Sequence, residues 1–305
     1  MNRKVVIGID IGGTNTKVGI FSQEGELIDS LHFPTHKDSP SDFFKFIHQE
    51  TINTLAKHHI ELSVILGIGI GAPMANAHTG TITYAHNLGW RDVPIQKEFI
   101  ELFNCPVFLD NDANLAALGE SYFGAGKDAH SFILITLGTG VGTGLIINKK
   151  IVRGYNGLGG EGGHIVIDTL QQRVCPCGGI NHIEAYLGAK GIMQTFQEND
   201  FNINIKDFSS YLHQGDSKAQ KCLELMCDQL STAIVNMSVL IGPERIILAG
   251  GVSQIGELFL KKLEDKVNEK IFYSLKNQMT FHLASVSTQK GAIYGGAALV
   301  LAELT

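Results

Sequence analysis

The sequence predicts an α/β protein built from two related domains that face a cleft. Three observations support this fold class. Each half of the chain opens with β-rich runs joined by a glycine turn and continues with alternating helices and strands. The 35 glycines fall in clusters at the ends of strands, which is typical of tight turns rather than of a flexible segment. Hydrophobic residues form 44% and charged residues 18% of the 305 residues, the balance of a globular chain about two domains long.

The first half of the chain follows the order strand, turn, strand, strand, helix. Phe43, Phe46, Ile47, Ile52 and Leu55 recur near helical spacing and predict the first helix. The predicted strands are 4–10, 17–21, 26–33, 64–72 and 106–112, and the predicted helices are about 41–58, 96–103 and 114–121.

The second half restarts the same order and carries a long insertion at about 155–215. The predicted strands are 130–138, 143–148, 150–154, 245–251 and 281–286, and the predicted helices are 217–240, 257–270 and 291–303. We therefore expect a small α/β lobe from 1–113 plus about 291–305 and a large α/β lobe from 114–290 that contains the insertion.

Composition and charge exclude several classes of protein. The formal net charge of −6 gives no electrostatic footprint for nucleic acid, which usually needs a basic face, and the scatter of charges along the sequence shows no basic patch of note. Asp10 interrupts the first apolar run, so no signal peptide is expected, and glycines break the apolar stretch 132–147 into strand, turn and strand. Five cysteines without a signal peptide indicate a reducing compartment. The expected location is the cytoplasm.

Three glycine turns lie at strand ends, at residues 10–14, 137–144 and 248–252. Glycine lets backbone N–H groups approach an anion closely, and threonine hydroxyls add donors. Each turn alone is better explained as an ordinary hairpin or strand-to-helix turn. Together they favour a nucleotide site in which two β-hairpins hold the phosphates, because the chain shows neither the P-loop pattern nor the dinucleotide pattern.

These turns carry a resemblance to a known superfamily. DIGGTNTK, LGTGVGTG and LAGGVS resemble the phosphate-1, phosphate-2 and adenosine segments of the actin, sugar-kinase and heat-shock ATPases. Within that superfamily, LDNDANLAALGE, RGYNGLGGEGGH and CPCGGINHIEAY resemble the ROK family, over a match from about Val5 to Ala302. The resemblance implies a duplicated ribonuclease H-like fold with two lobes around a cleft. The family contains bacterial glucokinases, N-acetylhexosamine kinases, fructokinases and sugar-responsive repressors.

The resemblance implies a sugar kinase, a phosphotransferase that moves the γ-phosphoryl group of ATP to an alcohol group. Glucose is the first choice of acceptor, and N-acetylmannosamine, N-acetylglucosamine and fructose are the alternatives. Asp10 is expected near Mg²⁺, through water, because Mg²⁺ binds few protein carboxylates. Lys17 is equally explained as a solvated strand residue. The implied nucleotide-binding residues are Asp10, Gly12, Gly13, Thr14, Asn15, Thr16, Lys17, Gly138, Thr139, Gly140, Val141, Gly142, Gly250 and Gly251.

Asn111 and Asp112 follow a predicted strand, at the end where ligands gather in α/β sheets. A carboxylate there can accept the proton of a sugar hydroxyl, and the Asn111 amide can hold the neighbouring hydroxyl. From the spacing alone, helix capping explains these residues equally well. The resemblance implies that Asp112 is the catalytic base. The implied sugar-binding residues are Asn87, Asn111, Asp112, Glu161, His164 and Glu184, although a Glu-Gly-Gly-His loop is also common as an exposed turn.

The resemblance also implies a structural zinc ion. The family segment has the form CxCGxxGCxE, with three cysteines and an upstream histidine as ligands. In this chain His182 stands at the third cysteine, so the implied ligands are His164, Cys175, Cys177 and His182. Asn181 replaces the preceding glycine and is a residue that tolerates positive φ. Without the family context, two cysteines and two histidines are more often unligated.

Two departures from the family pattern lie near the expected sugar pocket and bear on specificity. Met74 follows Pro73 where the family usually has glycine, and Gly162 replaces a larger apolar residue.

Three other functions are alternatives to a sugar kinase. A sugar-responsive repressor carries a helix-turn-helix segment ahead of the kinase-like fold, and it is not expected because the first phosphate strand begins at about Lys4. Asp112 argues against a non-catalytic sugar-binding protein. An ATPase of filament or chaperone type leaves the Cys/His segment unexplained. The expected partners are the sugar and ATP, with no nucleic acid or membrane, and a homodimer by resemblance.

Overall fold

The computed structural model describes residues 4–167, 172–286 and 291–304. The chain forms two compact units, which are described separately. The first unit consists of the described residues of 1–127, 150–159 and 285–305, and the second of those of 128–149 and 160–284. This division differs from the expected boundary at 113/114, since the first unit includes the helix that begins at Asp112 and the returning segment 150–159.

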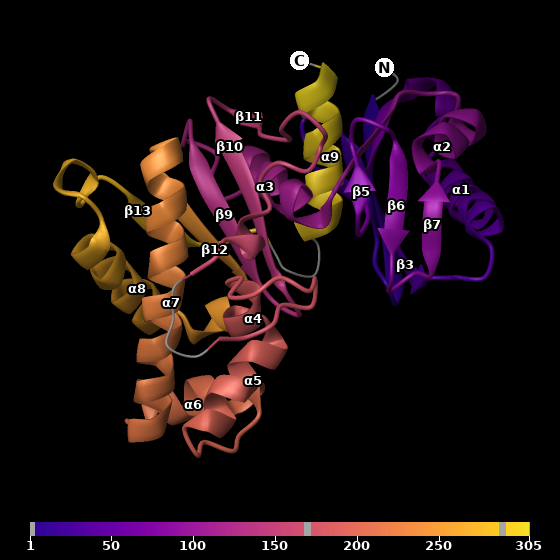
Figure 1. Ribbon diagram of the computed structural model, residues 1–305. Helices are drawn as coiled ribbons and strands as arrows, with labels where there is room; N and C mark the ends of the chain where they lie inside the picture. The colour runs from indigo at the N-terminus through magenta and orange to yellow at the C-terminus, as the bar shows by residue number, and fades with distance from the viewer. Residues whose placement is uncertain (1–3, 168–171, 287–290, 305) are drawn as a thin grey trace. The chain divides into compact units, whose positions relative to one another are not determined.

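The first unit, whose helices α1 and α2 and strands β5, β6 and β7 are labelled in Figure 1, contains a central sheet with strand order β3-β2-β1-β4-β8. Strand β1 pairs antiparallel with β2 and parallel with β4, which in turn pairs parallel with β8. A smaller antiparallel sheet has the order β5-β6-β7. The elements are β1 Val5–Ile11, β2 Asn15–Ser22, β3 Leu27–Pro34, α1 Pro40–Lys57, η1 Leu62–Val64, β4 Ile65–Gly71, β5 Ala75–Asn76, β6 Thr81–Ala85, β7 Trp90–Val93, α2 Ile95–Phe103, β8 Val107–Asp110, α3 Asp112–Phe123, β11 Lys150–Ile151 and α9 Gly291–Leu304.

Alternation along β1 gives the central sheet two covered faces. Val5, Ile7 and Ile9 belong to a core with buried residues of α1 and α2. Val6 belongs to a separate core with Ile293 and other residues of α9. Helices therefore cover both faces of this mixed sheet, in which β1, β4 and β8 are parallel.

Glycines let α9 approach the sheet closely. A Cβ at Gly8 would lie 2.0 Å from the Ile293 carbonyl oxygen, and one at Gly69 would lie 2.0 Å from the Gly296 carbonyl oxygen. Both contacts are far shorter than van der Waals distance, so any side chain there would force the helix away from β1 and β4.

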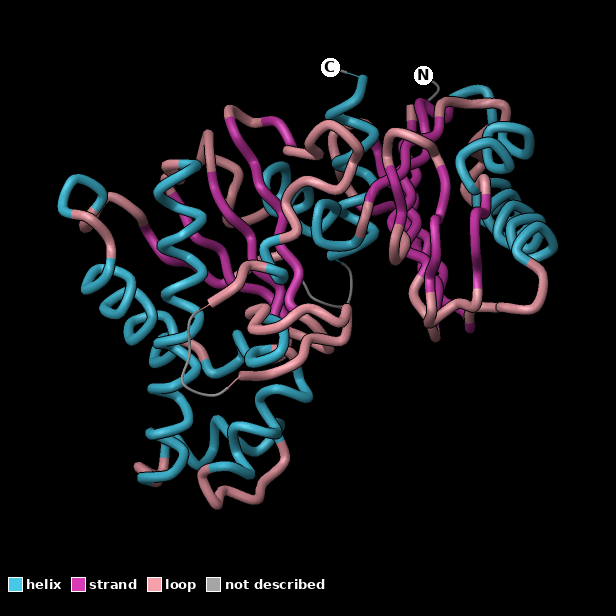
Figure 2. The backbone as a smooth tube through the Cα atoms, in the orientation of Figure 1, coloured by secondary structure: helices cyan, strands magenta, loops and turns pink. Residues whose placement is uncertain are grey.

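The second unit repeats this topology, with strand order β10-β9-β12-β13 (labelled in Figure 1; the strands are magenta in Figure 2). Strand β9 pairs antiparallel with β10 and parallel with β12, and β12 pairs parallel with β13. The predicted duplicated α/β fold is thus confirmed. The elements are β9 Phe132–Leu137, β10 Val141–Ile147, η2 Gly162–His164, α4 Glu184–Leu187, α5 Ala189–Glu198, η3 Ile205–Asp207, α6 Phe208–His213, α7 Ser217–Ile241, β12 Arg245–Gly250, η4 Val252–Ile255, α8 Glu257–Lys270, η5 Tyr273–Leu275 and β13 Thr280–Leu283.

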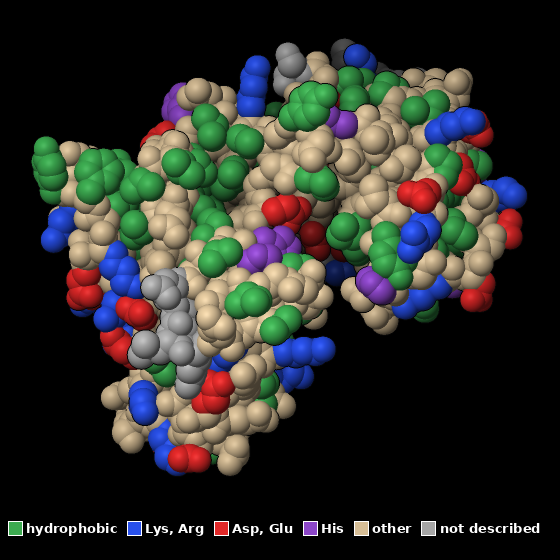
Figure 3. Space-filling view, in the orientation of Figure 1, with side chains coloured by type: hydrophobic (Ala, Val, Ile, Leu, Met, Phe, Trp, Pro, Cys, Tyr) green, Lys and Arg blue, Asp and Glu red, His purple; other side chains and the backbone are tan. Residues whose placement is uncertain are grey.

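Helices α7 and α8 pack together and contribute Leu230 and Leu263 to a core that includes Ile133 and Ile246 of the sheet. Exposed ion pairs join the two helices. The ammonium of Lys266 lies 2.6 Å from a Glu224 carboxylate oxygen, and Figure 3 shows basic and acidic side chains interspersed over this pair. Such surface pairs contribute little stability.

Three differences from the predicted elements stand out. The insertion contains helices α4, α5 and α6, which were not predicted. The predicted strand 150–154 shrinks to Lys150–Ile151, and the last predicted strand, 281–286, ends at Leu283. Within the described ranges, no helix is both long and apolar enough to cross a membrane.

Candidate active site

The carboxyl ends of three neighbouring parallel strands meet at one edge of the first unit's sheet. Asp10 of β1 pairs with Gly71 of β4, and Gly71 pairs with Asp110 of β8. The chain then continues from Asp110 directly into Asn111 and Asp112. This edge is where open α/β sheets bind their ligands.

Asp10 carries an unusual carboxyl group. It is half-buried, and burial raises its pKa to about 6. Lys17, its cross-strand partner, lowers the pKa, while the charge of Asp112 raises it. Two carboxyl groups therefore interact electrostatically at this edge, a feature typical of functional sites.

Asn111 and Asp112 occupy different positions at the start of α3. Asn111 is the N-cap of α3: its side-chain oxygen accepts a hydrogen bond from the Asn114 N–H at 2.8 Å. Asp112 is the first helical residue, so α3 begins two residues earlier than the predicted helix at 114. The Asn111 cap uses the oxygen, which leaves the side-chain NH₂ able to donate to a ligand.

The Asp112 residue is exposed to solvent, but the surrounding protein atoms partly desolvate its carboxyl group. This desolvation raises the pKa of Asp112. Hydrogen bonds from backbone N–H groups act in the opposite direction. One of them comes from Ala113, at 2.9 Å from Oδ1. The result is an accessible carboxylate that is more basic than an ordinary aspartate.

Thr35 holds the turn between β1 and β2, which contains Gly12, Gly13 and Thr14. Its hydroxyl donates to the Gly12 carbonyl oxygen at 2.7 Å, and its N–H donates to the Thr14 carbonyl oxygen at 2.9 Å. Thr16 is fully buried, and its hydroxyl lies 2.9 Å from the Thr35 hydroxyl, so it helps to hold Thr35 against the turn. The sequence prediction did not include Thr35, which only β2–β3 pairing brings to this turn.

Asn87 lies against the same turn, in the connection between β6 and β7. A Cβ at Gly13 would lie 2.9 Å from the Asn87 Cβ. The structure therefore brings a predicted sugar-binding residue beside the predicted phosphate turn, within one unit.

Met74 lies in the loop that leaves β4. Two residues before it, the Ala72 N–H donates to the Asp110 carbonyl oxygen at 3.3 Å, so the start of this loop lies at the end of β8. Its φ is +56° and its side chain is 53% exposed. The Thr83 N–H donates to the Met74 carbonyl oxygen at 3.2 Å and so fixes the main chain of the loop at Met74. The loop keeps a left-handed conformation, which explains why glycine suits this position.

In the second unit, the segment from Gly138 to Gly142 covers the β9–β10 turn and the start of β10, and it lies against Glu184, the first residue of α4. The Val141 N–H donates to Glu184 Oε2 at 3.0 Å. A Cβ at Gly140 would lie 2.3 Å from the same oxygen, so only glycine allows this contact. The Gly138 and Thr139 carbonyl oxygens accept the Ala189 N–H, and α5 thus begins directly on the turn.

A cavity of about 470 Å³ adjoins the end of β12 in the second unit. Gly250 there has φ +92°, and a Cβ would lie 2.3 Å from the Leu137 carbonyl oxygen. The cavity is mostly apolar and has the size of a small-molecule site. Its lining includes residues of the insertion that the sequence prediction missed, and consists of Ile192, Ile205, Lys206, Phe208, Ser209, Met226, Gly251, Val252, Gln254 and Ile255.

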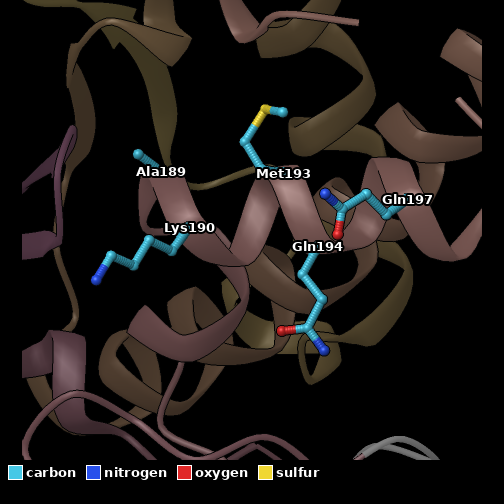
Figure 4. A pocket seen from close by; sticks show the side chains of 5 residues that line it. All are labelled: Ala189, Lys190, Met193, Gln194 and Gln197. Carbon is cyan, nitrogen blue, oxygen red and sulfur yellow. The ribbon is translucent and has the colours of Figure 1, made fainter. Parts of the chain in front are cut away.

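A second hollow, of about 570 Å³, lies along α5 (Figure 4). Its lining comes from a single helix and consists of Ala189, Lys190, Met193, Gln194 and Gln197. Figure 4 shows the Lys190 ammonium extending away from the two glutamine side chains. No set of polar groups converges here among these lining residues.

The four predicted zinc ligands lie together in the second unit, with their ligand atoms within 4.8 Å of one another. His164 Nδ1 lies 3.2 Å from His182 Nδ1 and 3.9 Å from Cys175 Sγ, and Cys177 Sγ lies 3.1 Å from His182 Nδ1. Zn–N and Zn–S bonds of about 2.0–2.3 Å in a tetrahedron place ligand atoms about 3.3–3.8 Å apart. Both the donor set and its spacing fit Zn²⁺.

Asn181, which precedes His182, has φ +59°, the conformation expected of the glycine it replaces. Its side-chain oxygen accepts the Arg173 N–H at 3.1 Å and the Tyr186 hydroxyl at 2.8 Å. The asparagine thus keeps the turn and also ties the loop to its surroundings.

Glu161 and His164 flank Gly162 at η2. A Cβ at Gly162 would lie 2.8 Å from the Met237 sulfur and 2.8 Å from the Thr143 hydroxyl. Met237 and Thr143 therefore fill the space that a larger residue would need, and they explain the departure from the family pattern.

The repeated fold, the three glycine turns and the paired carboxyl groups define a protein of the actin-like and sugar-kinase ATPase class. The chain belongs to the ROK family, whose profile matches residues 6–303. A glucokinase of Halalkalibacterium halodurans is 34% identical over 97% of this chain and 95% of its own length. A xylose repressor of Caldicellulosiruptor bescii is 29% identical over 79% of this chain and 63% of its own length.

A solved structure of a ROK family glucokinase from Streptomyces griseus, in complex with glucose and AMPPNP, is also similar. It has a TM-score of 0.74 and 28% identity, with coverage of 97% of this chain and 98% of that chain.

Proposed function

We propose that this chain is an ATP-dependent hexose kinase that phosphorylates glucose. The enzyme class, a sugar kinase that transfers phosphate to an alcohol group, is shown by its glucokinase relatives. The choice of glucose is the proposal. The observation that carries the catalytic part is the placement of Asp112, with its raised pKa, beside Asp10 at one sheet edge.

Asp112 is the proposed base. A sugar hydroxyl is a weak nucleophile near neutral pH, and a positioned carboxylate that takes up its proton lowers the barrier to attack. The raised pKa makes the Asp112 carboxylate a better proton acceptor than the carboxylate of an ordinary aspartate. The free NH₂ of Asn111 and the side chain of Asn87 supply hydrogen bonds to neighbouring hydroxyls.

ATP would use the glycine turns of each unit and the apolar cavity. The turn at Gly12 to Thr14 presents its backbone to phosphate, and the turn at Gly138 to Gly142 does so in the second unit. The cavity beside Gly251 fits adenine, because it joins apolar side chains to polar groups on Ser209 and Gln254. Asp10 would hold Mg²⁺ through water, and the cation would neutralise charge on the transferred phosphoryl group.

Zinc would be held by His164 Nδ1, Cys175, Cys177 and His182 Nδ1, and it would supply structural order rather than chemistry. Coordination through Nδ1 leaves His164 Nε2–H to donate to a sugar hydroxyl. Glu161 and Glu184 complete the proposed sugar contacts, and Cys175 Sγ lies 3.6 Å from Glu184 Oε1.

A coupled ATP assay with glucose, mannose, fructose, N-acetylglucosamine and N-acetylmannosamine tests the proposal. Glucose should give the highest kcat/KM, and Asp112→Asn should lower kcat by about two orders of magnitude or more while glucose binding persists in calorimetry. A higher kcat/KM for an N-acetylated hexosamine would replace glucose as the acceptor. Sugar binding without phosphorylation of any of the five would favour the regulator class that the xylose repressor represents.

Two further proposals concern the setting of the enzyme. We propose a cytoplasmic location, which fractionation of cells tests. We also propose a homodimer, which sedimentation of the purified protein tests directly.

A further inference from the structure

A buried carboxylate lies two residues before the proposed base and is not used by the chemistry above. Asp110 ends β8 and is 2% exposed. Its Oδ1 accepts the Asn111 N–H at 2.9 Å and the Asn114 side-chain NH₂ at 2.7 Å. A buried anion of this kind persists only where several donors compensate it.

The third donor comes from a distant part of the sequence. Arg153 Nε lies 2.7 Å from Asp110 Oδ2, and Arg153 Nη2 lies 2.8 Å from a Glu303 carboxylate oxygen on α9. Burial lowers the pKa of Arg153, but the two carboxylates outweigh it and raise that pKa. Arg153 therefore joins the end of β8 to the end of α9 with a rigid, two-pronged group.

The corner from β8 to α3 is thereby held from several sides. Asn111 caps the helix through the Asn114 N–H, and Asp110 holds both the Asn111 N–H and the Asn114 amide. The Asn114 side-chain oxygen is buried and has no hydrogen-bond partner in the described part of the chain, so the hydrogen bond from its NH₂ to Asp110 is what orients that side chain. Asp112 projects from this corner as the first residue of the helix.

Segment 150–159 is itself fastened to the first unit at a second point. The Asn76 side-chain NH₂ donates to the Asn156 carbonyl oxygen at 2.9 Å, and a Cβ at Gly157 would lie 2.7 Å from Asn76 Oδ1. Arg153 therefore reaches Asp110 from a segment whose backbone is held by the hydrogen bond from Asn76.

We infer that Asp110, Arg153 and Glu303 form a positioning network that sets the location of the Asp112 carboxylate against the acceptor hydroxyl. The inference rests on the proposed function, because it assumes that Asp112 is the base. Asp110 and Arg153 act through the corner and not on the substrate. A displacement of a catalytic group by about 1 Å lowers turnover by about 100-fold, which sets the scale of the effect.

The test separates positioning from stability. Arg153→Lys keeps the charge but loses the two-pronged contact, and it should lower kcat about tenfold with KM for glucose and ATP within about twofold. Arg153→Met alone leaves the buried Asp110 carboxylate without its ion-pair partner, and Asp110→Asn alone removes one of the two carboxylates that pair with Arg153. Both Tm and kcat should therefore fall in each single variant. The double variant Asp110→Asn/Arg153→Met leaves no unpaired charge at that contact. It should recover most of the lost Tm while kcat stays at least about tenfold low, since the anion that orders the corner is gone.

Glu198→Gln is the matched control. It removes the partner of another buried arginine, Arg173, whose Nη2 lies 2.5 Å from Glu198 Oε2 in the second unit. This variant should lower Tm without changing kcat per folded molecule.

Two results would overturn the inference: kcat that recovers together with Tm in the double variant, or wild-type kcat in Arg153→Lys. If Asp112→Asn itself turns over at the wild-type rate, the proposed base is wrong, which is a distinct outcome. An inactive Asp112→Asn with fully active Asp110 and Arg153 variants rejects the network alone.

Discussion

Replacement of Asp10 by asparagine should make the folded protein more stable and, at the same time, inactive. The side chain is half-buried, and its pKa rises from 3.8 to about 6 in the folded chain. Ionisation is therefore harder in the folded state than in the unfolded state. The resulting penalty on folding is absent below pH 3.8, grows as pH rises, and is complete above pH 6. Asparagine has the same shape and never ionises.

The size of the effect follows from the pKa difference. About 2.2 units separate 3.8 from about 6, and each unit corresponds to 1.36 kcal/mol, so the upper limit is about 3 kcal/mol. Partial access to solvent reduces this value, and we expect about 1–3 kcal/mol at pH 7. For a folding unit of this size, the corresponding rise in Tm is about 3–8 °C.

Thermal melts of wild-type and Asp10→Asn protein between pH 4 and 8, without Mg²⁺ or nucleotide, measure this difference. The gap in Tm should be small at pH 4, widen up to about pH 6–7 and then stay level. Asp29→Asn is the control with the opposite sign, because hydrogen bonds from His58 and the Ser30 N–H lower the pKa of Asp29. The reasoning would be refuted by an Asp10→Asn variant that is no more stable than wild type at pH 7. A difference in Tm that does not change with pH would also refute it.

Three further predictions concern single sites. Gly13→Ala should raise KM for ATP about tenfold or more, because the new Cβ would lie 2.9 Å from the Asn87 Cβ. Adding Asn87→Gly should restore KM for ATP but not KM for glucose. Unchanged kinetics in the single variant would contradict the close contact. Elemental analysis of chelator-washed, tag-free protein should find about one zinc per chain, and His182→Ala should lose the metal and glucose affinity together. A metal-free protein with full activity would reject the zinc site. Met74→Gly should leave Tm nearly unchanged, since relief of about 1 kcal/mol of left-handed strain is offset by about 0.5–1 kcal/mol of backbone entropy. The same variant should alter the ratio of kcat/KM between glucose and N-acetylglucosamine, and an unchanged ratio would remove Met74 from the sugar site.

Local pattern was sufficient to predict most of the regular elements. Helix α1 was expected at about 41–58 and lies at Pro40–Lys57, and α8 was expected and observed at 257–270. Strong apolar periodicity and turn residues define such elements without help from distant contacts. The insertion was harder to predict because α4 and α6 span four and six residues, too short for a periodic signal.

Asp112 shows where sequence spacing stops being informative and the three-dimensional structure is needed. Its spacing was compatible with helix capping and with catalysis, and the sequence alone did not separate them. The structure assigns the cap to Asn111 through a hydrogen bond to the Asn114 N–H and leaves the Asp112 carboxyl group accessible. Backbone conformation at a strand-to-helix corner decides which of two adjacent polar residues caps.

The sequence by itself determined the family, the duplicated α/β fold, the glycine turns and the residue types available for phosphate, sugar and metal binding. These features depend on local order along the chain, where turn glycines and short motifs keep fixed spacing. Only the tertiary structure placed Thr35 under the first glycine turn, Glu184 against Val141, and Arg153 on Asp110, 43 residues away. Those contacts depend on strand register and on the return of distant segments, and both are set by packing of the whole chain rather than by any window of sequence.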